Sequence, residues 1–211
     1  MRASQIVNYF FTLLVICNPL LGISMLLALM QGRTLEEKRR TALITGISVA
    51  IILVTVTWIG IYVLEALGIR LESFQVAGGF IVFMIALSML QAQPSRMKQS
   101  SQDQREATQK ESIAVVPLAI PVLAGPGAIG TVIVAVNSYP GIANHFIITL
   151  CAILVALVLV FVLYFANPLE KMLGQTGINL VNRISGLILA AMAIDMLASG
   201  IAGLFPALCK L

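Results

Sequence analysis

Two short stretches place helix-breaking residues inside otherwise apolar sequence. Asn18-Pro19 interrupts the first apolar run of the chain, and Gly125-Pro126-Gly127 interrupts the fourth. A proline inside a helix removes a backbone hydrogen bond and costs about 3 kcal/mol, and glycine lowers helix stability further. In a membrane the freed amide and carbonyl groups cannot face lipid, so they must be buried in protein or line a wet cavity.

Such breaks are suited to binding a small polar solute. The bare N–H groups at the start of a half-helix attract a carboxylate, and exposed carbonyl oxygens attract an ammonium group or a cation. A zwitterionic amino acid matches both, although prolines that merely kink packed helices are the open alternative. The predicted substrate site comprises Asn18, Pro19, Gly22, Ser24, Gly125, Pro126, Gly127 and Thr131.

Asp195 is an acid placed deep in the sixth apolar run. It follows Arg183 by a dozen residues, which is about 18 Å of helix in a hydrocarbon core of about 30 Å. A charged carboxyl there costs at least about 2.5 to 3.5 kcal/mol, and no basic residue in another run can neutralise it. We therefore predict that Asp195 exchanges a proton during a transport cycle; a protonated acid bonded to a neighbouring helix is the alternative.

The composition requires lipid around these residues. Of the 211 residues, 59% are hydrophobic and 10% are charged, which is outside the range of water-soluble domains. The net charge of +4 is not gathered in one patch, so no nucleic-acid partner is expected. Six runs are long enough to cross a bilayer, at positions 6–30, 42–64, 74–90, 113–136, 146–166 and 184–205.

The cations predict the orientation of the chain. With both termini outside, three basic residues (Arg2, Arg70 and Lys210) are external and ten are cytoplasmic, as the positive-inside rule requires. In a bacterial inner membrane both termini would be periplasmic. Thr34 and Glu37 have the spacing of a capping box at the start of the second run, and Trp58 falls near its outer end.

The two halves of the chain resemble each other when shifted by about 107 positions. Three runs per half is an odd number, so the second half must enter the membrane from the opposite face. We predict an all-α membrane protein with six transmembrane helices as two inverted three-helix repeats, in which helices one and four are broken. The matched pairs are Pro19 with Pro126, Ser24 with Thr131, Gly79 with Gly186, and Ser88 with Asp195.

The domain prediction follows from the same repeat. The whole chain, 1–211, forms a single transmembrane domain. Repeat one spans 1–91 and repeat two spans 113–211, and the polar segment 92–112 is a cytoplasmic linker between them.

Several segments resemble the MarC family of bacterial inner-membrane proteins over nearly the whole chain. They are Asn18-Pro19, ESIAVVPLAIP at 111–121, AGPGAI at 124–129 and RISGL at 183–187. The resemblance implies kinship with small neutral amino-acid transporters, whose substrates include glycine and alanine. The family usually has a glycine and a proline where this chain has Leu21 and Ser24, so a milder first break is expected.

These observations predict a secondary transporter that moves a small neutral solute by alternating access, coupled to a proton or sodium ion. A passive channel and a membrane protein of non-transport function are the alternatives. No HExxH pair, GxSxG turn or second membrane aspartate is present, so an enzyme is not expected. We expect no metal and no cofactor; the partners are the solute and the lipid bilayer.

Overall fold

The computed structural model describes residues 1–91, 119 and 123–206, and the bounded elements among them are all helices. α8 contains one non-helical residue, Gly174, with φ 63° and ψ 173°. The helices are α1 (Ala3–Cys17), α2 (Pro19–Leu29), α3 (Leu35–Ala66), α4 (Leu71–Leu90), α6 (Pro126–Ser138), α7 (Ile142–Tyr164) and α8 (Ala166–Leu204).

Five segments of the described chain are long and apolar enough to cross a membrane, which makes this a multi-pass membrane protein. α6 has only 13 residues and is too short to do so alone. The predicted six-span inverted repeat is not confirmed, because most of the first half of the predicted fourth span, together with the predicted linker 92–112, lies outside the described residues. The five segments are Ala3–Leu29, Leu35–Ala66, Leu71–Leu90, Ile142–Tyr164 and Thr176–Leu204.

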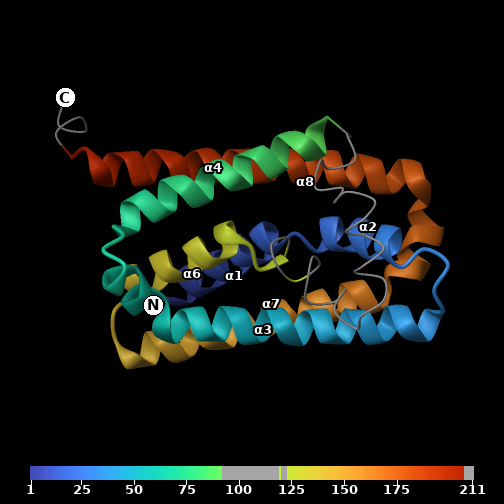
Figure 1. The fold of residues 1–211 in the computed structure, drawn as a ribbon, viewed down its shortest axis with the longest axis horizontal. Helices are drawn as coiled ribbons and strands as arrows, with labels where there is room; N and C mark the ends of the chain where they lie inside the picture. Colours follow the sequence, from blue (N-terminus) through green and yellow to red (C-terminus); the bar gives the residue numbers. More distant parts are fainter. Residues whose placement is uncertain (92–118, 120–122, 207–211) are drawn as a thin grey trace.

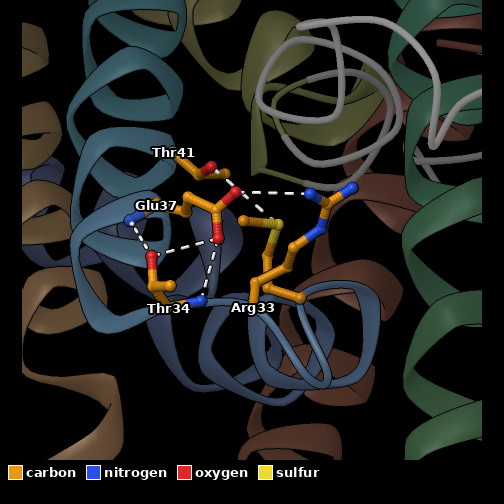
Figure 2. Close-up of polar contacts among 5 residues, drawn as sticks. Arg33, Thr34, Glu37 and Thr41 are labelled. Atoms are coloured by element: carbon orange, nitrogen blue, oxygen red, sulfur yellow. Dashed lines mark hydrogen bonds and ion pairs between the residues drawn. The ribbon is translucent and has the colours of Figure 1, made fainter.

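The start of α3 is fixed by the capping box that the sequence predicts. The Thr34 N–H donates to Glu37 Oε2 at 2.8 Å, and the Glu37 N–H donates to Thr34 Oγ1 at 3.3 Å (Figure 2). Arg33 adds an ion pair to Glu37 at 3.2 Å. Two amides that helix geometry leaves without partners are thereby satisfied, and the prediction is confirmed.

The long helices lie along one axis of the molecule in three layers (Figure 1). α3 packs extensively against α7 on one side, α4 packs against α8 on the other, and α1, α2 and α6 lie between the two pairs. In both outer pairs one helix comes from each half of the chain. The α3–α7 pair is close: a β-carbon at Gly46 would overlap the Val160 side chain.

The α4–α8 pair contains one contact made twice. A β-carbon at Gly79 would lie 3.1 Å from the Ala193 carbonyl oxygen, and one at Gly186 would lie 3.1 Å from the Ala86 carbonyl oxygen. Gly186 and Ala193 follow Gly79 and Ala86 by the same 107 positions. Each helix thus supplies the glycine in one contact and the alanine carbonyl in the other. Two helices related by a twofold axis between them would make this pair of contacts. Glycine at both points permits close backbone approach, which is how membrane helices commonly pack.

Candidate functional site

The first helix break is confined to Asn18, which lies between α1 and α2 in the left-handed region at φ 45° and ψ 75°. Asparagine tolerates this conformation better than most residues. Its N–H donates to the carbonyls of Leu14 and Val15, both at 3.1 Å, and its Oδ1 accepts from the Leu21 N–H at 3.1 Å. The side chain therefore stands in for the Cys17 carbonyl that a continuous helix would offer to Leu21.

Asn18 also connects this break to α4. Its side chain is buried, with 4% exposed, and Nδ2 donates to Met89 Sδ at 3.3 Å. Sulfur is a weak acceptor, so this bond constrains the break less than the bond to the Leu21 N–H does. Met89 was not among the predicted site residues, because a methionine in an apolar helix carries no signal of a polar role.

The second break precedes α6. Gly125 caps the helix with an extended backbone, Pro126 is its first residue, and no side chain bonds to its first amides. Just before the break, the Ala124 N–H donates to the Ala119 carbonyl at 2.9 Å. That spacing of five residues is the wide turn of a π-helix, which often marks a functional site. The N–H of Gly127 points out of the start of α6 without a side-chain cap.

The structure brings the two breaks into contact. A β-carbon at Gly127 would lie 3.3 Å from Ile16 Cγ2, and one at Gly22 would lie 3.1 Å from Leu123 Cδ2. Ile16 and Leu123 each lie two positions before a break. Gly22, Gly127 and both of these side chains are buried. The predicted site residues Gly22 of α2 and Gly127 of α6 therefore each pack against a side chain that precedes the opposite break.

Ser24 and Thr131 occupy equivalent places after the two breaks. Ser24 Oγ donates to the Leu20 carbonyl at 3.2 Å, and Thr131 Oγ1 donates to the Gly127 carbonyl at 2.9 Å. Each bond reaches four residues back along its own helix. Both hydroxyls are half-buried. The pairing of these two residues at an offset of 107 thus extends to their hydrogen bonds.

Asn182 of α8 contacts the predicted site residue Ser24, although its neighbour Arg183 indicated a position at the membrane surface. Its Nδ2 donates to Ser24 Oγ at 2.9 Å, while its Oδ1 is buried and has no partner among the described residues. It borders a small, partly open hollow between α2 and α8, with room for about one water molecule. The other lining residues are apolar: Leu20, Ile23, Leu169, Leu173, Ile178 and Val181.

Asp195 lies apart from the other predicted site residues. Ala193 and Gly200 of α8 pack against the α4 backbone, and Asp195 is exposed on the other side of the helix. Within the described part of the chain it has no hydrogen bond or ion pair. No group of His, Cys, Asp and Glu among these residues could hold a metal ion. Proton exchange by Asp195 stays a prediction, without contact to the two breaks.

Comparison with known proteins identifies the relatives of this chain. Residues 3–205 match the family described as MarC family integral membrane protein. The membrane protein YhcE of Escherichia coli is 38% identical over 95% of this chain and 94% of its own length. YvbG of Bacillus subtilis is 34% identical over 99% of both chains. Both names describe membrane proteins of the group UPF0056 and specify no substrate. No solved structure matches the chain.

Proposed function

The chain belongs to the MarC family of integral membrane proteins, and from that premise we propose that it is a secondary carrier of a small neutral solute, acting by alternating access. The proposed solute is a small amino acid such as glycine or alanine, and the proposed membrane is the bacterial inner membrane. The observation that carries the proposal is the direct packing of the two helix breaks, with Ile16 against Gly127 and Leu123 against Gly22.

The chemistry at the breaks fits a small zwitterion. The uncapped amides of Gly127 and Ala128 at the start of α6 would donate to a carboxylate, and the helix dipole favours a negative charge there. Asn18 and the carbonyl oxygens at the end of α1 would accept from an ammonium group.

Alternating access requires that the two breaks separate and close again. With Ile16 and Leu123 packed against the opposite glycines, the site is closed, and α2 and α6 must move apart to admit a solute. The equivalent contacts of Gly79 and Gly186 between α4 and α8 support the proposed six-span inverted repeat; the proposed periplasmic position of the termini rests on the distribution of basic residues. In such a repeat the two halves can exchange conformations and expose one site to each side in turn. A passive channel is the second candidate, but the close packing at the breaks favours a carrier.

Transport by the purified protein in liposomes tests this function. We expect saturable uptake of radiolabelled glycine and alanine, with accumulation when a proton or sodium gradient is imposed. Flux that does not saturate and only follows the solute gradient would establish the channel instead. Absence of any flux or binding for these solutes and for serine would refute transport of small amino acids.

A matched pair of glycine variants tests whether the solute passes the two helix breaks. A β-carbon at Gly127 would overlap Val82, whereas one at Gly130, a turn later on α6, would make an ordinary contact 3.6 Å from Met196 Cε. We expect Gly127→Ala to lose transport and Gly130→Ala to retain it. Equal transport by both folded variants would show that the solute does not pass the breaks.

A further inference from the structure

A bond between a carboxamide and a hydroxyl joins α8 to the half-helix α2. Asn182 Nδ2 donates to Ser24 Oγ at 2.9 Å, and the Ser24 hydroxyl donates in turn to the Leu20 carbonyl of its own helix. Because the single hydroxyl hydrogen is used within α2, Ser24 can only accept from α8. The pair therefore holds the half-helix that follows the first break against a helix from the other half of the chain.

The same two types of side chain occur at the equivalent places of the other half. Thr131 follows Ser24 by 107 positions. Gln75 precedes Asn182 by the same number and carries the same carboxamide on a side chain one methylene longer. Thr131 Oγ1 donates to the Gly127 carbonyl, so its lone pairs can accept from a carboxamide, as those of Ser24 do. Both the donor and the acceptor of the Asn182–Ser24 bond thus have an equivalent.

The backbone places Gln75 beside the second half-helix. A β-carbon at Gly78 would lie 3.3 Å from the Pro126 carbonyl oxygen, so this side of α4 packs against the start of α6. Gln75 precedes Gly78 by three residues and lies near the same side of the helix. A β-carbon at Gly130 would lie 3.7 Å from Phe74 Cε1, which brings the next residue of each helix to a similar level. Gln75 is thus level with the hydroxyl that follows Gly130.

The two pairs differ in their bonding. Among the residues that the structure describes, the Gln75 side chain makes no hydrogen bond, and the Thr131 side chain bonds only to its own helix. α2 and α6 extend from the middle of the molecule in opposite directions (Figure 1), so the two pairs lie toward opposite ends. The half-helix at one end is therefore held by this bond, and the equivalent donor and acceptor at the other end are not bonded to each other.

We propose that Gln75 donates to Thr131 in the opposite-facing state of the carrier. The Asn182–Ser24 bond breaks in that state. The inference rests on the proposed carrier function, in which two inverted halves change state by exchanging conformations, so that a bond made by one half is replaced by its equivalent in the other. One bond is then gained for each bond lost. Removal of either pair shifts the population toward the state that keeps the other pair.

A single cysteine beside the first pair reports which state is populated. Ile23 is buried, with 3% exposed, and lines the hollow next to Asn182, so separation of α2 from α8 exposes it. The reporter is Ile23→Cys with Cys209 replaced by serine; Cys17 and Cys151 are buried. Its rate of alkylation by a polar thiol reagent is measured in lipid nanodiscs, where the reagent reaches both faces of the membrane.

The two pairs should have opposite effects on this rate. Asn182→Ala should raise it about threefold, the change in population that one hydrogen bond between membrane helices produces, and Gln75→Ala should lower it by a similar factor. Thr131→Val should match Gln75→Ala, and the double variant should be no slower than either single one, because both remove the same bond. Ser73→Ala, at an exposed position of α4, is the control and should leave the rate unchanged.

Gln75→Ala is the decisive variant, because Gln75 lies toward the other end of the molecule from the reporter. A rate that this variant leaves unchanged or raises would overturn the proposal. If the wild type still shows saturable uptake in that case, the carrier function stands without the Gln75–Thr131 bond. Opposite rate changes without uptake of any tested amino acid would support the two exchanging pairs and refute transport of small amino acids.

Discussion

The Nδ2 atom of Asn182 lies 2.9 Å from Ser24 Oγ, so a hydrogen bond joins α8 to the half-helix that follows the first break. The Ser24 hydroxyl donates a hydrogen bond to the Leu20 carbonyl, and the Asn182 Oδ1 has no partner in the described chain. A buried acceptor without a protein partner is normally bonded to water, and the hollow beside Asn182 has room for about one water molecule. The Asn182–Ser24 bond therefore links α8 to α2, the half-helix that begins at the Asn18 break.

We expect the Asn182–Ser24 bond to contribute about 0.5 to 1.5 kcal/mol to stability. Asn182→Ala and Ser24→Ala should each destabilise the protein, and the double variant should be destabilised by less than the sum, because both singles remove the same bond. Unfolding in mixed detergent micelles measures all three. Strict additivity would show that the two side chains do not interact.

A second prediction concerns the tight contact between α3 and α7. Gly46→Ala introduces a β-carbon that overlaps Val160, and overpacking of this kind costs about 1 to 3 kcal/mol. The second change Val160→Ala removes the obstructing methyl groups and should recover most of the loss. The thermal midpoint of the purified variants reports both effects. Gly130→Ala, whose added carbon meets only an ordinary contact, is the control.

The conformation of Asn18 yields a third prediction. Asn18→Gly keeps access to the left-handed region but loses the bond to the Leu21 N–H, whereas Asn18→Ala also pays about 1 to 2 kcal/mol of backbone strain. The alanine variant should therefore be less stable than the glycine variant, reversing the order seen inside ordinary helices. If alanine were the more stable, α1 and α2 would form one continuous helix in the membrane.

The sequence was sufficient for features that depend on local chemistry. The Asn18-Pro19 break and the Thr34–Glu37 capping box were predictable because each is decided by a few adjacent residues. The direction in which the Asp195 side chain points could not be predicted. Its helix is apolar on every side, so no periodic pattern marks the face that packs inward. The sequence also did not indicate how far this helix extends: the charge-free run begins at 184, whereas α8 begins at Ala166 and its candidate membrane segment at Thr176.

The last prediction tests whether Asp195 is the coupling group of the proposed transport cycle. Because its side chain faces away from both breaks, we expect Asp195→Asn to keep gradient-driven accumulation of solute, while Asn18→Ala reduces it. Uptake into liposomes with and without an imposed proton gradient makes the comparison. Should Asp195→Asn still carry solute down its own gradient but fail to accumulate it, the carboxyl would be the coupling group despite its outward position.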